Sequence, residues 1–142
     1  MSIVHESIRY KSRCRVRDRK IWKRELLDEI RTIANDTELR RLWSGKDPTA
    51  ISSFAEEVSH VFDDYDIDGF IAAGAAEGNL TVEQFGAICQ FRDKFAEYVA
   101  LHRAHDLGTI GHEVVLADPR WKEVELAAGH FIALLGYRGS AT

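Results

Sequence analysis

Apolar residues recur at intervals of three and four along most of the chain, which is the spacing of one face of an α-helix. Between about Lys20 and Ala34 this face holds Ile21, Trp22, Leu26, Ile30 and Ile33. Residues 39–43 continue as a short helix that ends at Gly45. The same spacing returns in residues 51–62, 85–102 and 121–135. The pattern predicts a bundle of four to six helices.

Residues that favour helix N-termini stand before three of these segments. Asp47-Pro48 and Asp118-Pro119 each combine an Asp N-cap with a proline at the first helical position. Thr81 and Gln84 have the spacing of a capping box, in which two side chains satisfy free backbone amides of the first turn. We therefore predict helices that begin just after residues 47, 81 and 118.

Residues 3–17 have a period of two instead. Cations alternate there with mainly apolar residues, which puts the two kinds on opposite faces of a β-strand. The other strand-like run is His112–Ala117. The predicted fold class is therefore mostly α: a single-domain helical bundle with a minor two-stranded β-ribbon formed by residues 3–17 and 112–117. Within that domain we expect a basic strand or arm (1–18), a helical body (19–136) and a tail (137–142).

The composition is that of a globular protein, with 45% hydrophobic and 30% charged residues among 142. Only two cysteines occur, and no basic start is followed by an apolar run, so we expect neither a structural disulfide nor a signal peptide. No apolar stretch approaches the roughly 20 residues that cross a bilayer. These features favour a soluble, cytoplasmic protein without a membrane partner.

An acidic segment at residues 64–69 resembles the first half of an EF-hand calcium loop. It reads Asp-Tyr-Asp-Ile-Asp-Gly, with Asp64, Asp66 and Asp68 at loop positions one, three and five. The resemblance implies that these three residues bind Ca²⁺. The twelfth position, where the family has a bidentate glutamate, is Ala75. The alternative interpretation, which we favour, is an acidic turn after a helix.

A second cluster contains His102, His105, Asp106 and His112. Residues 105–111 resemble the metal-binding His-Asp segment of HD-domain phosphohydrolases, and the resemblance implies a metal-dependent hydrolase. That family also needs an upstream histidine and a downstream aspartate, which this sequence does not supply at suitable positions. The cluster has the residue types for Zn²⁺ or another transition metal. Structural histidines at a helix end are the interpretation that we favour.

A third motif, Glu57-Val58-Ser59-His60, is a single Glu-x-x-His, whereas di-iron bundles carry two copies and further glutamates. One copy therefore predicts no metal centre. The sequence contains neither a Gly-rich phosphate loop nor a G-x-S-x-G nucleophile elbow, and we assign no catalytic residue. We expect no cofactor and no stoichiometric metal, with Ca²⁺ or Zn²⁺ at the two sites above as the alternative.

Charge divides the chain into a basic start and an acidic remainder. Residues 1–46 carry 13 Lys/Arg against 7 Asp/Glu, although the formal net charge of the chain is −4. Charge asymmetry of this kind marks partner-binding segments, and it also arises where a basic segment lies on an acidic body. The candidate partner-binding residues are the alternating cations Arg9, Lys11, Arg13, Arg15, Arg17 and Arg19.

The leading functional hypothesis is a small non-enzymatic interaction or regulatory protein of the inhibitor or immunity-protein class. Its partner would be another protein, or a second copy of the chain in a homodimer. One alternative is a metal-binding or HD-like hydrolase that uses the His102–His112 cluster. The other is a nucleic-acid-associated protein that uses the basic arm, although the acidic remainder would repel phosphates.

Overall fold

The structure is a computed structural model, and it describes residues 19–49, 51–102 and 111–136. Its elements, in chain order, are α2 (Arg19–Ala34), α3 (Asp36–Ser44), α4 (Phe54–Ser59), the π-helical turn η1 (His60–Asp64), α5 (Ile67–Glu77), α6 (Val82–Leu101), α7 (His112–Ala117) and α8 (Pro119–Leu134). The predicted fold class, a mostly α helical bundle, is confirmed. None of the helices in these residues is both long and apolar enough to cross a membrane.

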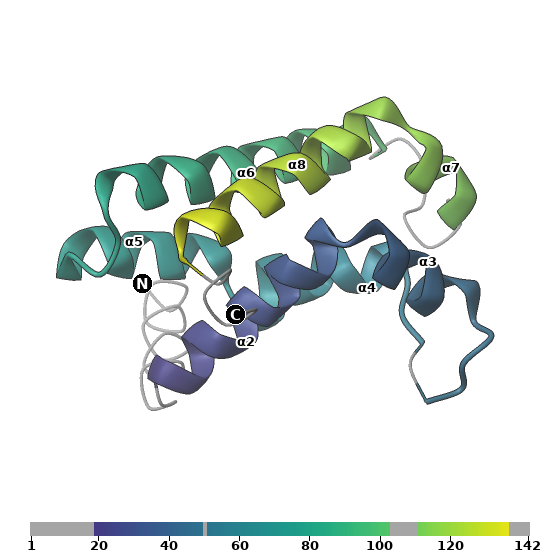
Figure 1. Ribbon diagram of the computed structural model, residues 1–142, viewed down its shortest axis with the longest axis horizontal. Coiled ribbons are helices and arrows are strands. Elements are labelled where there is room, and N and C mark those ends of the chain that lie inside the picture. Colours follow the sequence, from purple (N-terminus) through teal and green to yellow (C-terminus); the bar gives the residue numbers. More distant parts are fainter. Residues whose placement is uncertain (1–18, 50, 103–110, 137–142) are drawn as a thin grey trace, which may run out of the picture.

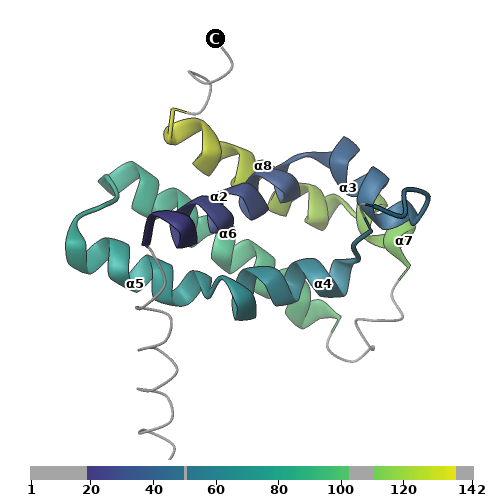
Figure 2. The ribbon, with the colours of Figure 1, turned by 90° about the horizontal axis from the view of Figure 1, so that it is seen from below.

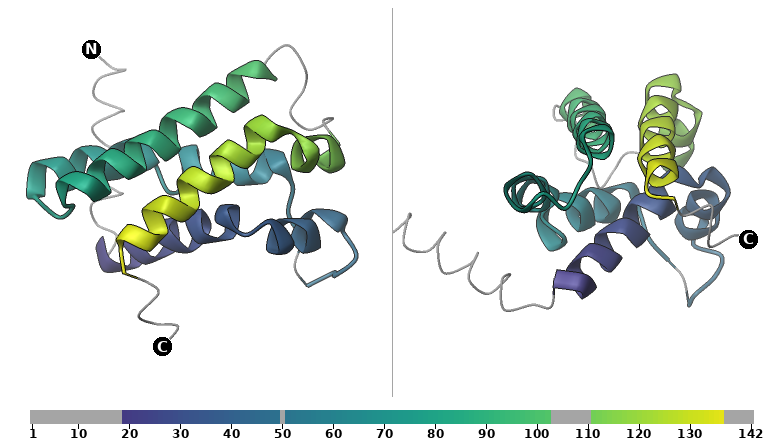
Figure 3. Two further views of the ribbon diagram at one scale, coloured as in Figure 1. Left: turned by 45° about the horizontal axis from the view of Figure 1, so that its top comes forward. Right: turned by 60° about the vertical axis from the view of Figure 1, so that its left-hand side comes forward.

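The helices form two layers. In Figure 1, α6 and α8 run side by side in one layer, and α2, α4 and α5 lie in the other. Figure 3 shows the same division from two further directions. Seen from below, α4, η1 and α5 follow one another in nearly one line, and α2 lies beside them (Figure 2). The short helices α3 and α7 meet at one end of the bundle.

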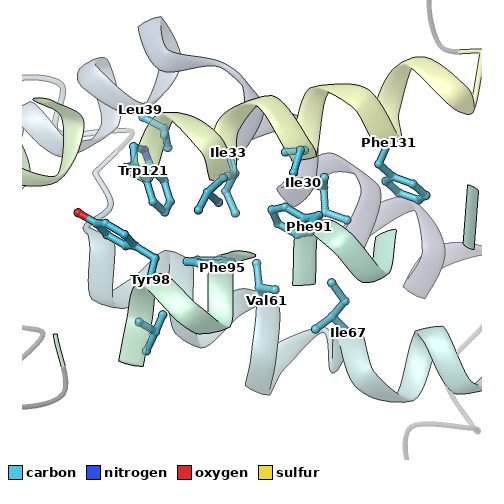
Figure 4. Packing of buried hydrophobic residues seen from close by; sticks show 14 of the residues in the cluster. Ile30, Ile33, Leu39, Val61, Ile67, Phe91, Phe95, Tyr98, Trp121 and Phe131 are labelled. Carbon is cyan, nitrogen blue, oxygen red and sulfur yellow. The ribbon is translucent and has the colours of Figure 1, made fainter. Parts of the chain in front are cut away.

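Aliphatic and aromatic side chains fill the space between the layers, and Figure 4 shows part of this core, with Trp121 of α8 among its aromatic members. Trp121 is fully buried. Its ring lies 5.5 Å from the rings of Phe95 and Tyr98 on α6, 5.7 Å from Phe54 on α4 and 6.0 Å from Trp43 on α3, measured between centroids. One side chain therefore joins four helices, and large buried aromatics dominate the energetics of such cores.

Two of the three predicted helix starts are confirmed. Asp118 caps α8 with Pro119 at the first helical position, and Thr81 caps α6 in a complete capping box. The start at Asp47-Pro48 is wrong. The Asp47 carboxylate accepts hydrogen bonds from the amide and hydroxyl of Thr49 and so forms a turn of its own, and the next helix begins after Ser53.

The predicted strand at residues 112–117 is also wrong, because these residues form helix α7. Val115 and Leu116 are both buried whereas Val114 is 61% exposed, which is not the alternation of a strand. A short apolar run is compatible with a strand or a helix. Here its packing against α3 and α8 favours the helix. Residues 3–17, the other half of the predicted ribbon, lie outside the described residues.

The capping box generates a prediction for stability. Thr81→Ala removes the oxygen that accepts a hydrogen bond from the Gln84 amide at 3.0 Å, and we expect it to lower the free energy of unfolding by about 1 kcal/mol. Thr37→Ala, at an exposed position inside α3, is the control. Urea denaturation measures both variants, and equal midpoints for wild type and Thr81→Ala would contradict the role of this cap.

Candidate metal centre

Three potential metal ligands meet where α2 packs against the α4–η1 segment. Glu29 comes from α2, Glu57 from α4 and His60 from the first position of η1. One ligand atom of each residue lies within 4.8 Å of the other two. The Nδ1 atom of His60 is 3.5 Å from Oε1 of Glu29 and 3.7 Å from Oε1 of Glu57. In the described part of the chain, this is the group with the residue types and spacing of a metal site.

Local structure explains why these side chains converge. Glu57 and His60 are three residues apart, so they lie on the same side of the α4–η1 helix. The backbone N–H of Tyr65 donates to the carbonyl of His60 at 2.8 Å, which makes a π-helical turn. Such turns are rare and occur frequently at functional sites. Here the turn carries both His60 and Asp64, whose Oδ2 is 3.9 Å from Nε2 of the imidazole.

Glu57 is held in place from the protein interior. The residue is only 2% exposed. Its Oε2 atom accepts a hydrogen bond from the Ser52 hydroxyl at 2.5 Å and a longer one from the Trp43 indole at 3.4 Å. Both donors bind the same oxygen, which leaves Oε1 on the side of His60. The carboxylate is therefore oriented toward the other two ligands before any ion binds.

Two polar atoms of the group are buried without a hydrogen bond. Oε2 of Glu29 and Nδ1 of His60 find no hydrogen-bond partner within the described residues. A buried polar atom without a partner costs about 1–3 kcal/mol, so native proteins contain few of them. Two such atoms in one group are the positions where a bound ion or a water molecule would find ligands.

Electrostatics at the group favour a bound positive charge. Burial, the hydrogen bond and charge of Glu57, and then the charge of Asp64 raise the pKa of Glu29 to about 10. The side chain of Glu29 is only 11% exposed, so water screens this repulsion poorly. Without a cation, Glu29 therefore keeps its proton at neutral pH. A cation that replaces the proton would neutralise the carboxylates directly.

The geometry suits a transition metal. Two carboxylates and one imidazole are ligands that Zn²⁺, Mn²⁺ and Fe²⁺ share, whereas Ca²⁺ and Mg²⁺ prefer oxygen ligands alone. Ligands at about 2.1 Å from a tetrahedral ion are about 3.4 Å apart, close to the observed separations of 3.5 and 3.7 Å. Three protein ligands would leave a position open for water.

The aspartates of the EF-hand-like segment have three separate roles. Asp64 faces His60, as described above. Asp66 has a φ of 45° and caps α5 by accepting a hydrogen bond from the Gly69 amide at 3.1 Å. Asp68 forms an ion pair with Arg92 of α6 at 2.7 Å. Because α5 begins at the fourth position of the presumed loop, the structure does not gather the three carboxylates around one point.

The other predicted site residues are only partly described. His102 follows the last residue of α6 and packs against Tyr98, with a centroid distance of 4.7 Å. His112 begins α7, whereas His105 and Asp106 lie outside the described residues. Of the candidate partner-binding cations, Arg19 begins α2, and Arg9, Lys11, Arg13, Arg15 and Arg17 lie outside the described residues.

Sequence reasoning missed Glu29 and set Glu57 and His60 aside, although a signal was present. Glu29 is three residues after Leu26 and four before Ile33, so it occupies a position of the apolar face. Glu57 stands in the same relation to Phe54 and Val61. A glutamate inside an apolar stripe, on each of two helices, predicts a buried polar site.

Comparisons of the chain with protein-family models, with curated proteins and with solved structures found no match. The Glu29–Glu57–His60 group is therefore the main indication of function in the described residues.

The raised pKa of Glu29 predicts how stability depends on pH. Between the ordinary carboxyl pKa of 4.5 and the raised value of about 10, the folded protein holds a proton that the unfolded chain has released. The free energy of unfolding therefore falls as pH rises, by at most about 1.4 kcal/mol per pH unit from this group. Glu29→Gln removes the titration and keeps a donor for Glu57. With a chelator present to remove metal ions, we expect the free energy of unfolding of the variant to rise relative to that of the wild type between pH 6 and pH 9.

Urea midpoints at several pH values measure this difference. Other titrating groups cancel, because wild type and variant share them. Glu83→Gln, at an exposed position of α6, should follow the wild-type profile. Parallel profiles for wild type and Glu29→Gln would show that Glu29 is ionised in the folded protein.

Proposed function

We propose that the protein binds a divalent transition-metal ion, of the Zn²⁺, Mn²⁺ or Fe²⁺ type, through Glu29, Glu57 and His60. The observation that carries the proposal is the pair of buried atoms without hydrogen bonds, Oε2 of Glu29 and Nδ1 of His60, within one three-residue ligand set of the described chain. A metal ion among the three ligands would give Nδ1 of His60 a partner and would neutralise the two carboxylates together.

The surroundings of the three ligands support this proposal over a purely structural group. Histidines that bind metals usually direct their second nitrogen to a carboxylate, which fixes the tautomer and the ring orientation. In His60, Nδ1 faces the two glutamates and Nε2 faces Asp64. The His60 side chain is 35% exposed, which gives an ion and its water ligands a path from solvent.

The proposal replaces the expectation, drawn from the sequence, that no metal is bound, and it moves the metal-binding hypothesis away from the His102–His112 cluster. The hypothesis of a protein-binding regulatory protein remains a prediction, because most of its candidate residues lie outside the described chain. The two functions are compatible, since a metal site at the α2–η1 contact would stabilise the helical body without using the candidate partner-binding cations.

Titration of the metal-free protein with Co²⁺ tests the proposal, because the visible absorption of Co²⁺ reports its ligands. We expect one ion per chain, and competition with Zn²⁺ should abolish the spectrum. Glu29→Gln and His60→Asn should each weaken binding at least about 100-fold, since each removes one of three protein ligands. Glu83→Gln and His130→Asn, at exposed positions of α6 and α8, are the matched controls. Unchanged affinity in both ligand variants would contradict the site.

Asp64→Asn tests the outer carboxylate separately. The change keeps the size of the side chain but removes the charge that faces Nε2 of His60 at 3.9 Å. We expect Co²⁺ affinity to fall about 10- to 100-fold, as for other outer ligand partners. Asp63→Asn, the neighbouring carboxylate, is the control. Equal losses in both variants would point to the general negative potential and not to orientation of His60.

A further inference from the structure

A second feature, separate from the metal centre, is a pocket of about 210 Å³ between the first turns of α2, the helix α5 and the α5–α6 connection. Figure 2 shows the start of α2 beside α5. Trp22, Phe70, Ala73, Gly74 and Leu80 supply most of its wall, and Lys23 lies at its edge. The pocket is smaller than the roughly 300 Å³ of sites for drug-sized ligands, so a ligand that fits it would be a small molecule.

The aromatic wall is fixed before any ligand binds. The indole N–H of Trp22 donates to the carbonyl of Tyr65 at 2.6 Å, which anchors the ring to the end of η1. The rings of Trp22 and Phe70 meet edge to face, with centroids 5.7 Å apart and planes at 85°. Phe70 is itself 8% exposed. A wall held by a hydrogen bond and a ring contact requires little reordering when a ligand binds.

Small residues line the pocket on the α5 side, and one of them makes room for Leu80. A Cβ atom at Gly74 would lie 3.0 Å from Cδ1 of Leu80 and 3.2 Å from its Cγ, so a larger residue would displace Leu80. Ala73, the neighbouring residue of the wall, contributes a single methyl group. Bulky side chains at these positions would fill the space that the structure leaves.

Two lysines are among the described residues that line the pocket. Lys20 and Lys23 lie on the first turns of α2, and none of the described lining residues is acidic. The first turn of α2 also contains no acidic residue. The chain as a whole is negative, with a formal net charge of −4. The pocket thus pairs an apolar interior with a cationic rim.

From these observations we infer that the pocket binds a small amphipathic carboxylate. Its hydrocarbon body would lie between Trp22, Phe70 and Leu80, and its carboxylate would meet the ammonium group of Lys23. Burial of the hydrocarbon supplies affinity, and the lysines discriminate against uncharged molecules of the same length. The inference does not depend on the metal site, because the two share no lining residue.

Octanoate is the probe for the test, and octanol is its uncharged counterpart. Titration calorimetry of the full chain should give saturable, one-to-one octanoate binding, at least about 10-fold tighter than octanol. Ala73→Leu fills the pocket and should abolish binding of both, whereas Ala72→Leu, at the adjacent exposed position of α5, should leave it unchanged. Circular dichroism confirms that each variant is folded.

Lys23→Gln keeps the pocket and tests the charge alone. It should reduce the preference for octanoate over octanol to about 2-fold or less, and Lys46→Gln, exposed after α3, should not. Because Lys23 is exposed, Lys23→Gln should fold like the wild type. This variant therefore tests the inference even if Ala73→Leu does not fold. Absence of saturable octanoate binding, or equal affinities for octanoate and octanol in the wild type, would overturn the inference.

Discussion

Two glutamates that face each other inside a helix contact impose the main constraint on this structure. If Glu29 and Glu57 were both ionised at about 4 Å, their repulsion would be on the order of 4 kcal/mol in a partly screened environment. The contact between α2 and the α4–η1 segment therefore favours a proton or a cation between the carboxylates, next to Nδ1 of His60. Hydrogen bonds from Ser52 and Trp43 stabilise one oxygen of Glu57 but do not reach Glu29. The packing of α2 against the α4–η1 segment thus depends on what lies between the Glu29 and Glu57 carboxylates.

Trp43 connects that polar space to the hydrophobic core. Its indole N–H points to Glu57, while its ring packs against Phe54 and Trp121 at centroid distances of 6.1 and 6.0 Å. The aromatic cluster therefore determines where the donor for Glu57 lies. A ligand set that is supported by a rigid core keeps its geometry when no ion is bound, which is the arrangement that precise binding sites require. The same burial that stabilises the fold raises the pKa of Glu29, so stability and the binding site have a common origin.

The helices with long apolar stripes and side-chain caps were predictable from the sequence. The stripe of Leu26 and Ile30 predicted α2, and the caps at Thr81 and Asp118 predicted α6 and α8. Short segments were not predictable, since residues 112–117 have no caps and depend on packing. The site was predictable only in part. The Glu57–His60 spacing is local, but its pairing with Glu29 depends on which helices become neighbours, and a hydrophobic pattern alone does not contain that information.

The acidic segment after α4 has the aspartates of an EF-hand loop but does not have the loop's geometry. An EF-hand loop needs the acidic residues at positions one, three and five to converge, but here Asp66 adopts a left-handed backbone conformation and caps α5, which begins at the next residue. The three carboxylates are then separated: Asp64 turns back toward His60, Asp66 caps the new helix, and Asp68 reaches Arg92 on α6. Asp64 is four residues after His60, so the two side chains lie on the same side of the helical segment. The acidic run therefore contributes to the candidate metal centre through its first residue alone, and its other two aspartates help to fix the direction of α5.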